Sequence, residues 1–349
     1  MKRLENYAFL ETFSPSELPS EYLAARVKGK RSHVCRKWEI VLEQPDPAAY
    51  IASKRYSNIG ELQKKDFADR LVNQEYRWLY LKMNPVLRKI FYPFFALAEL
   101  RKLIACLRFL ATNRDRDRIS TVLAHSLLAA PLLNQLLSGD EPEAIMKRLR
   151  AYLTRLFEKS VPTFDLKDDL TPKKMEEAIH SAFFEECFSK KLHPVIRNYL
   201  QDRIDYYNIL LLYRHIKWHQ EDSPIFLSNG TISADRFSSL TEKSTDAINI
   251  KDKNMDAIRK IVLKKYPERK SVSGESSAIH KRSIFSFDNI ENYLVQREYD
   301  MREKRRIQFC DVELFLHYLI LLDLERRNSG VIIYGNLFSV EQIGEELIA

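Results

Sequence analysis

Two apolar stretches of the sequence each carry an acid followed three residues later by an amide. Asp205 precedes Asn208 in YLQDRIDYYNILLLYR, and Glu325 precedes Asn328 in YLILLDLERRNSGVII. Residues three apart lie on the same face of a helix. As a binding site, such a pair could hold a cation or an acid-accepting partner. As structure, a polar pair on a buried helix needs a hydrogen-bond partner, most simply an arginine or a backbone group of a neighbouring helix.

A weaker copy of this pattern lies upstream, where Glu99 stands three residues before Lys102 in FFALAELRKLIACLRF. The acids Glu99, Asp205 and Glu325 lie roughly a third of the chain apart, which is typical of internal repetition. Recurrence once per repeat suits a contact that defines the fold better than it suits a single active site. We therefore interpret these polar positions as structural.

The other residue patterns that could support catalysis are incomplete. Gly330 and Gly335 have the spacing of a phosphate-binding loop, but Asn-Leu follows where Lys-Ser/Thr is needed to reach the phosphates. His215 and His219 are four residues apart and could share a metal, yet the H-E-x-x-H glutamate and an obvious third ligand are missing. No G-x-S-x-G elbow is present. We expect no catalytic residues, no cofactor and no metal site.

The composition of the 349-residue chain favours an all-α protein. Hydrophobic residues make up 45% and charged residues 30%, and with 8 Gly and 13 Pro the sequence has few turn residues. Four scattered cysteines without a C-x-x-C pair indicate thiols in a reducing compartment. The opening residues lack the apolar core of a signal peptide, and charges interrupt the longest apolar run, residues 93–111. We expect a cytoplasmic protein, or one docked on a membrane through another component.

Two segments concentrate the positive charge of a chain whose net charge is +8. The first lies in a helix predicted for residues 22–42 with Ser20 as its N-cap, and the second in a charged helix predicted for residues 290–309. Acids alternate with cations in the second, and no zinc finger or RNP motif accompanies either, so nucleic acid is the weaker hypothesis. The candidate interface residues are Arg26, Lys28, Arg31, Arg302, Arg305 and Arg306.

Capping and turn residues predict the remaining helices. Asp140 is expected to cap a helix with Pro142 in its first turn, and Thr171 to cap one that starts at the following proline. Gly335 is expected to end the last long helix, and Ser339 forms a capping box, S-x-x-Q, for a short final helix. Further helices are expected over residues 59–83, 86–111, 120–137, 199–214 and 255–265, and a mobile loop or insertion over residues 268–283.

Three parts of the chain carry a family resemblance. At the C-terminus its residues are Tyr318, Leu319, Asp323, Glu325, Asn328, Ile332, Gly335, Ser339 and Ile343. They resemble the closing segment of the V-type/A-type rotary ATPase subunit called d in eukaryotes and C in prokaryotes. The stretch DYYNI at residues 205–209 is similar to the family's middle figure Val-Asp-x-x-Asn-Ile, and YLAARVKGKRSHV to its opening segment. Lys102 and Leu322 depart from the family, which has Asn and Lys there.

The resemblance implies an all-α funnel of three similar helical units around a pseudo-threefold axis, which we place at residues 1–118, 119–235 and 236–349. Such a subunit would sit on the cytoplasmic face of the proteolipid ring, receive the central stalk and pass torque between them as a non-catalytic rotor part. Other subunits would handle ATP and the transported ion, hydrogen ion or sodium. We expect acidic faces of these partners to contact the two basic segments, with membrane contact indirect and no small-molecule substrate.

Two alternatives stay open. The first is a helical binding or scaffold protein, RNA-associated or not, that is unrelated to ATPases. The second is an enzyme with a helical fold, which a concave pocket of convergent titratable groups with strongly perturbed pKa values would favour.

Overall fold

The computed structural model is helical throughout the residues that it describes. These are residues 8–14, 16, 18–47, 49–51, 67–112, 117–158, 160–161, 164–166, 171–218, 224–242, 248–267, 285–287, 289–304, 311–335 and 346–347. Within them the only β-type pairing is an isolated antiparallel bridge between Leu10 and Leu128. This confirms the all-α expectation, while the pseudo-threefold funnel stays a prediction. None of the described helices is long and apolar enough to cross a membrane.

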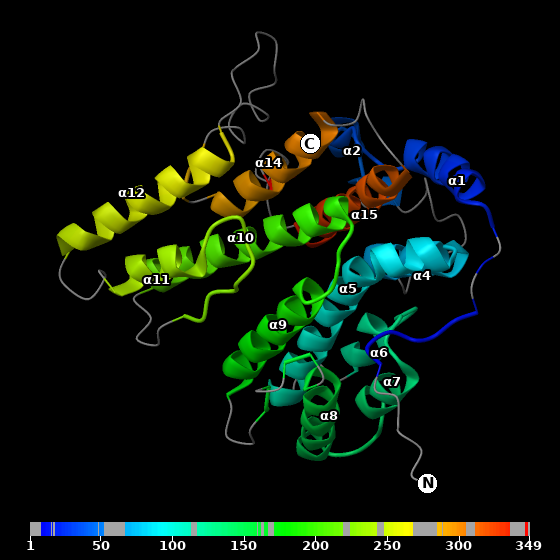
Figure 1. Ribbon diagram of the computed structural model, residues 1–349. Coiled ribbons are helices and arrows are strands. Elements are labelled where there is room, and N and C mark those ends of the chain that lie inside the picture. The colour runs from blue at the N-terminus through cyan, green and yellow to red at the C-terminus, as the bar shows by residue number, and fades with distance from the viewer. Residues whose placement is uncertain are drawn as a thin grey trace. The chain divides into compact units, whose positions relative to one another are not determined.

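The chain divides into two compact units. Unit 1 comprises Met1–Pro19, Asn73–Ile204 and Leu227–Ser233, and unit 2 comprises Ser20–Val72, Asp205–Phe226 and Ala234–Ala349. The boundaries fall within helices α4 (Phe67–Lys82) and α10 (Pro194–Lys217), which therefore contribute residues to both units (Figure 1). The predicted division into three repeats remains a prediction.

Unit 1 is organised around α5, which packs against three helices of the same unit, α6, α8 and α9. The unit's complete helices are α5 (Pro85–Thr112), α6 (Arg118–Val122), α7 (Ala130–Leu136), α8 (Pro142–Phe157) and α9 (Pro172–Phe188). An aromatic cluster on one side of α5 fills the core: Phe94 and Phe95 meet Tyr76 of α4 edge-on, with ring centroids 5.7 and 5.9 Å apart. The predicted helix over residues 86–111 is confirmed by α5.

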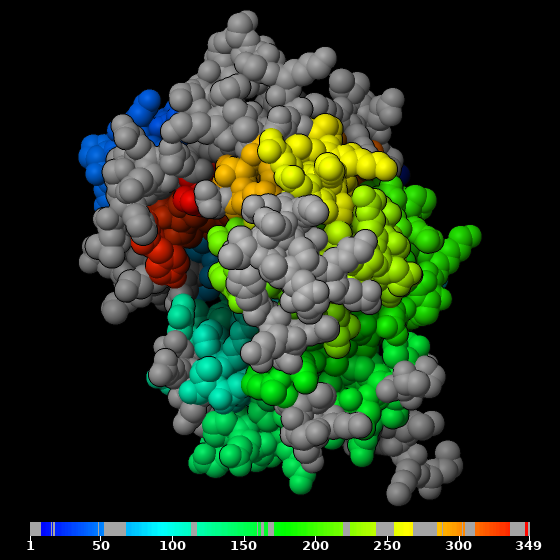
Figure 2. Space-filling view, turned by 90° about the vertical axis from the view of Figure 1, so that its left-hand side faces the viewer, coloured from blue at the N-terminus to red at the C-terminus, as the bar shows by residue number. Residues whose placement is uncertain are grey.

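Unit 2 is organised around α15, an apolar helix with buried side chains on most of its faces, against which α1 and α14 pack. The unit's complete helices are α1 (Ser20–Ser32), α2 (Trp38–Leu42), α11 (Ala234–Glu242), α12 (Ile248–Lys265), α14 (Ile290–Lys304) and α15 (Asp311–Tyr334). The amide of Gly335 donates to the carbonyl of Val331 at 2.8 Å where α15 ends, as predicted. Figure 2 shows α12 in yellow, and its exposed residues include Arg259 and Lys260.

The single helix predicted over residues 22–42 is wrong, because the chain leaves the helix at residues 33–37 and resumes as α2. The amide of His33 donates to the carbonyl of Lys30 at 3.1 Å, which tightens the last turn of α1. The amide of Cys35 then donates to the Glu325 carboxylate on α15 at 3.0 Å. A contact distant in the sequence thus replaces the helical bond, although no proline or glycine marks the break.

The single helix predicted over residues 120–137 is also wrong, since residues 123–129 separate α6 from α7. His125 adopts a positive φ of 58° there, and the N-terminal stretch pairs with the segment that follows. The amide of Glu11 donates to the Leu127 carbonyl at 2.8 Å, and the amide of Ala129 donates to the Phe9 carbonyl at 3.0 Å. These bonds satisfy backbone groups that a continuous helix would have satisfied internally.

Two capping predictions have opposite outcomes. Thr171 caps α9 as expected, because its hydroxyl accepts a hydrogen bond from the amide of Lys174 at 3.3 Å. Asp140 does not cap α8: the N-cap is Glu141, without a side-chain cap, and Asp140 pairs instead with Arg148 at 2.5 Å. The predicted capping box at Ser339, the predicted mobile loop at 268–283 and the first residues of the predicted helix at 59–83 lie outside the described residues.

Candidate functional site

The five polar residues singled out by the sequence are all buried. Glu99 on α5, Asp205 on α10 and Glu325 on α15 have exposed fractions of 1%, 0% and 5%, and the two amides, Asn208 and Asn328, are fully buried. Carboxylates in such positions are tolerated only where ion pairs or hydrogen bonds offset the loss of water. The partners of each acid therefore decide what it can do.

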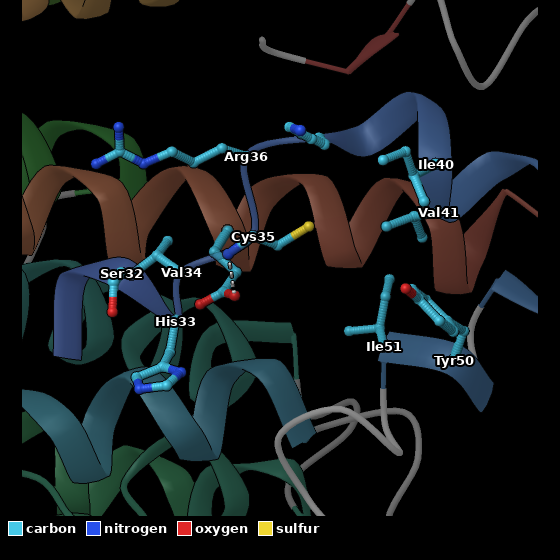
Figure 3. Close-up of a pocket in the computed structure, with 11 residues that line it drawn as sticks. Ser32, His33, Val34, Cys35, Arg36, Ile40, Val41, Tyr50 and Ile51 are labelled. Carbon is cyan, nitrogen blue, oxygen red and sulfur yellow. Dashed lines mark hydrogen bonds between the residues drawn. The ribbon is translucent and has the colours of Figure 1, made fainter. Parts of the chain in front are cut away.

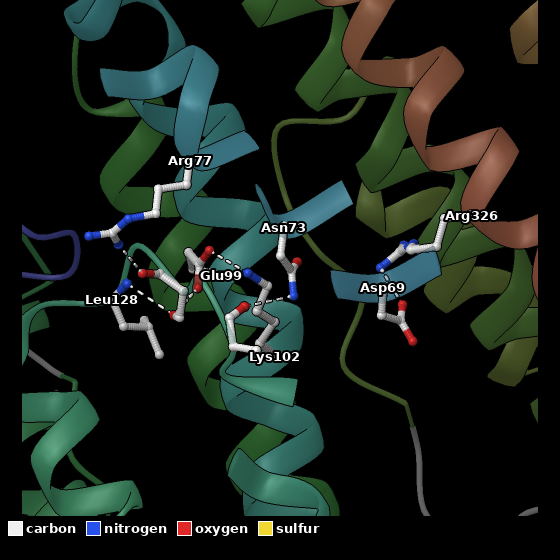
Figure 4. A network of polar contacts seen from close by, with 9 residues as sticks. Asp69, Asn73, Arg77, Glu99, Lys102, Leu128 and Arg326 are labelled. Atoms are coloured by element: carbon white, nitrogen blue, oxygen red, sulfur yellow. Dashed lines mark hydrogen bonds and ion pairs between the residues drawn. The ribbon is translucent and has the colours of Figure 1, made fainter. Parts of the chain in front are cut away.

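In unit 1, Glu99 joins α5 to the segment between α6 and α7 (Figure 4). One carboxylate oxygen, Oε1, accepts from the Lys102 ammonium at 2.7 Å, and the other, Oε2, accepts from the Ser126 hydroxyl at 2.5 Å. The Ser126 hydroxyl oxygen accepts in turn from the Leu128 amide at 3.2 Å. Lys102 thus supplies the counter-charge for the acid within one turn of its own helix.

Helix α4 contributes two further side chains to this network, and both donate to backbone carbonyls of the segment at residues 123–129. The Arg77 guanidinium donates to the Ser126 carbonyl at 2.8 Å, and the Asn73 amide group donates to the Ala124 carbonyl at 3.2 Å (Figure 4). The segment at residues 123–129 is therefore held by polar side chains from two helices. This explains how its backbone can be buried without a helix or a sheet around it.

In unit 2, Asp205 pairs with the Lys265 ammonium, which joins α10 to the end of α12. The Lys265 side chain is itself mostly buried, and its ammonium lies 5.4 Å from the ring centroid of Tyr266. The hydroxyl of Tyr293 on α14 donates to the Tyr266 carbonyl at 2.6 Å. Asp205 therefore lies in a set of contacts that connects three helices of this unit.

Glu325, the third acid, accepts the Cys35 amide and so holds the linker between α1 and α2 against α15. One helical position further on, Arg326 pairs with Asp323 at 3.1 Å and with Asp69 of α4 at 3.7 Å (Figure 4). Each of the three acids thus bonds a different segment of the protein. These contacts favour the structural interpretation of the acids over a shared catalytic or cation site.

A pocket that the sequence did not reveal opens beside Glu325. It has a volume of about 730 Å³ and lies between the α1–α2 linker, α2 and the short helical stretch at Tyr50 and Ile51 (Figure 3). The stretch HVCRKWEIV mixes cations with apolar residues, and this mixture could have indicated the pocket. A single helix over residues 22–42 would have placed these side chains on different faces of the helix. Because the chain breaks at residues 33–37, these side chains gather around one hollow.

Sequence reasoning also missed a polar cluster around one buried histidine, His317, where α14, α15 and the α1–α2 linker meet. The Nε2 atom of His317 lies 2.7 Å from the Glu303 carboxylate, which lies 3.7 Å from the Arg36 guanidinium. Burial lowers the pKa of His317 to about 4, and the Glu303 carboxylate opposes this shift only partly. His317 is therefore neutral near pH 7 and binds Glu303 as a hydrogen-bond donor.

The structure describes the side chains of three of the six predicted interface residues. Arg26 and Lys28 are exposed on α1, and Arg31 is half-buried near its end. The side chain of Arg302 on α14, and the residues Arg305 and Arg306, lie outside the part of the structure that is described. Two members of the N-terminal cluster, Arg26 and Lys28, thus face solvent, and their role in an interface stays a prediction.

The structure gives no support to a metal site at the histidine pair or to a phosphate-binding loop at the glycine pair. His215 is buried on α10, while His219, the second histidine of that spacing, lies outside the described residues. Among the described residues no group of three or more His, Cys, Asp or Glu side chains could hold a metal ion. Gly330 lies inside α15 rather than in a phosphate-binding loop.

Comparison with known proteins identifies a family for most of the chain and does not single out one site. A protein-family model described as "ATP synthase (C/AC39) subunit" matches residues 42–345. No curated protein matches the chain. The matched residues include all three buried acids and leave α1 outside.

Proposed function

Because the chain belongs to the ATP synthase (C/AC39) subunit family, we propose that it is a non-catalytic rotor subunit of a V/A-type ATPase. It couples the central stalk to the membrane proteolipid ring and passes torque between them during ATP-driven or ATP-synthesising ion transport. It is a peripheral component on the cytoplasmic face of the membrane. The observation that carries this proposal is the family match over residues 42–345.

The polar contacts of the core support a mechanical role. Glu99, Asp205 and Glu325 bond residues 27, 60 and 290 positions away in the sequence, so each acid links a long helix to a segment it does not follow directly. Buried bonds of this kind favour one arrangement of helices, because moving the partners apart would leave a buried charge unpaired. Stiff helix packing is what a torque-transmitting part needs. We propose that one such acid lies in each of three repeats, at residues 1–118, 119–235 and 236–349.

The proposal is tested by isolating the complex. A tagged full-length chain is recovered from its native membranes in mild detergent, and the co-purifying chains are identified by mass spectrometry. We expect a proteolipid and the central-stalk subunits in fixed ratio to the tagged chain. Recovery of RNA or of unrelated proteins alone would overturn the proposal and favour a helical scaffold protein.

A second experiment separates coupling from mere attachment. In membranes depleted of this chain, we expect ATP-driven ion uptake to be lost while the soluble sector retains ATP hydrolysis. Restoring the wild-type chain should restore uptake. Ion uptake at the wild-type level in depleted membranes would contradict the rotor role.

A further inference from the structure

The pocket beside Glu325 combines an apolar interior with a cationic edge. Ile40 and Val41 of α2 face Tyr50 and Ile51 across it, and the linker that carries Cys35 closes one end (Figure 3). Val41 and Ile51 belong to one buried apolar cluster, against which Tyr50 packs. The hollow therefore extends this core to the surface and offers apolar contacts to a side chain from outside.

Ile40 marks the entrance. It is 43% exposed although it is a large aliphatic residue, while its neighbour Val41 is almost fully buried. Exposed apolar side chains scattered singly need no explanation, but this one borders a cavity of about 730 Å³, a size in the range of ligand-binding pockets. An incoming apolar group would bury Ile40 together with the pocket walls.

The side of the pocket formed by the α1–α2 linker is basic, while the acid that lines the pocket, Glu325, accepts the Cys35 amide. Residues 22–38 contain six Lys or Arg residues and no acid, and His33, Arg36 and Lys37 of this run line the pocket. Lys37 and His33 are exposed, and Arg36 lies 3.7 Å from the Glu303 carboxylate. Charge of one sign at the mouth of a concave site concentrates ligands of the opposite sign.

The basic run is too long for one small anion. It extends from Arg26 on α1 through the linker to Lys37, which is about 20 Å at helical and extended rises per residue. A lipid headgroup or a free phosphate would contact only the end at the pocket, whereas a polypeptide with several acidic residues could follow the whole run. Tyr50 and Arg36, which line the pocket, are of residue types that are enriched at protein interfaces.

We propose that this pocket receives an apolar side chain from an acidic segment of another subunit of the ATPase complex. The apolar walls at Ile40, Val41, Tyr50 and Ile51 bind the anchor residue, and the run from Arg26 to Lys37 binds the flanking carboxylates. The inference rests on the proposed function, since the partner is a subunit of that complex.

Cys35 gives a direct readout of occupancy because it lines the pocket and is half-buried. Burial raises the pKa of both Cys106 and Cys187 to about 12, so these thiols react slowly with a maleimide. With Cys310→Ser in the tagged full-length chain, labelling then reports Cys35. We expect maleimide modification of Cys35 to be at least tenfold slower in the purified complex than in the free chain.

The occupant is identified by photo-crosslinking. Lys37 is replaced by p-benzoylphenylalanine in the full-length chain, and the purified complex is irradiated. We expect a crosslink to an Asp- and Glu-rich segment of one partner subunit. A crosslink to lipid only, or to a second copy of this chain, would overturn the proposal.

Two variants test the anchor contact. Ile40→Asp places a charge at the pocket entrance, and Val86→Asp, at a 67% exposed position of unit 1, is the matched control. Thermal unfolding of both free variants should match that of the wild type. In the complex, we expect Ile40→Asp to lose the protection of Cys35 and Val86→Asp to keep it.

The outcomes separate the two proposals. If the tagged chain recovers the proteolipid and stalk subunits but Cys35 stays unprotected and no crosslink forms, the pocket proposal fails and the proposed function stands. If those subunits are not recovered at all, the proposed function fails, and the pocket proposal fails with it.

Discussion

Asp205 and Asn208 show how polar side chains are accommodated inside an apolar helix. Asp205 is fully buried and pairs with Lys265, whose charge offsets part of the cost of removing a carboxylate from water. Asn208, one turn further along α10, is also fully buried and interacts with neighbouring groups. Because both side chains are buried, replacing either one would leave its partners without a hydrogen bond or a counter-charge inside the protein.

Replacing Asn208 by Leu should destabilise the protein by about 1 to 3 kcal/mol, because polar groups that face the amide would lose their partner inside the protein. Asn328→Ala on α15 should have an effect of the same order. The matched control is Asn198→Leu, at an exposed position of the same helix α10, which should change stability by less than about 0.5 kcal/mol. Urea denaturation followed by circular dichroism measures the difference, and wild-type stability of Asn208→Leu would argue against a structural role.

His317 should make the stability of the protein depend on pH in the acidic range. Its pKa is lowered to about 4 in the folded state, first by burial, against about 6.5 in the unfolded chain. Above pH 6.5 the residue is neutral in both states. Between pH 6.5 and 4 only the unfolded state takes up the proton, so stability falls as the pH falls, and below pH 4 the loss is complete, at about 3 kcal/mol.

The test of this dependence compares His317→Gln with the wild type between pH 7 and pH 4. The variant removes the titrating group, so its stability should fall less steeply with acidification. Nuclear magnetic resonance of the wild-type ring should show a neutral His317 down to about pH 5. A ring that is already protonated at pH 6.5 would show that the Glu303 carboxylate outweighs burial.

At the scale of elements, the two helix breaks share one feature. Residues 33–37 and 123–129 are anchored by a buried acid on a neighbouring helix, Glu325 and Glu99 respectively. A helix interrupted in this way gives up backbone bonds and gains contacts with segments distant in the sequence. No proline or glycine marks the break after α1, where the contact with Glu325 takes the place of a helical bond. The second break is followed by Pro131 in the first turn of α7, which cannot donate a helical hydrogen bond, so Glu99 and Pro131 both bear on it.

Removing the acceptor on Glu325 should therefore loosen the α1–α2 linker. In Glu325→Leu the Cys35 amide loses its partner, and we expect its hydrogen exchange to be at least tenfold faster than in the wild type. Glu325→Gln retains an acceptor oxygen at the same place and serves as the control, with exchange close to that of the wild type. Equal protection of Cys35 in the Leu variant would show that packing alone holds the linker.

At the scale of the whole molecule, the basic face of α1 concerns partners rather than stability. Arg26 and Lys28 are exposed there, so their replacement leaves the packing of α1 against α15 intact. The family to which the chain belongs assembles into a multi-subunit ATPase. The contribution of these side chains should thus appear in assembly and not in folding.

Charge reversal at Arg26, Lys28 and Arg31 should weaken assembly with the stalk and ring subunits. Complementary charges at an interface act mainly on association and are screened by salt, so the defect relative to the wild type should be largest at low salt and shrink as the salt concentration rises. The matched control reverses Lys147 and Lys173, which are exposed in unit 1. Recovery of the complex after washes of increasing ionic strength measures the effect, and unchanged recovery would remove α1 from the interface.

The sequence by itself determined the helical class, the long helices α5 and α15, the Thr171 cap and the family. These follow from local patterns: both helices are long apolar runs rich in helix formers, although α5 contains Pro93 and α15 contains Gly330, and a capping threonine acts within one turn. The sequence also singled out Glu99, Asp205 and Glu325, because acids in apolar helical runs stand out.

Only the tertiary structure decided what these acids bind and where the neighbouring helices stop. Ser126, Lys265 and the Cys35 amide lie 27, 60 and 290 residues from their acids, and no local pattern encodes such distances. The same holds for the pocket at Ile40, which exists because the chain leaves the helix at residues 33–37. A backbone amide takes the best acceptor that folding brings near it, and long-range packing supplied that acceptor here.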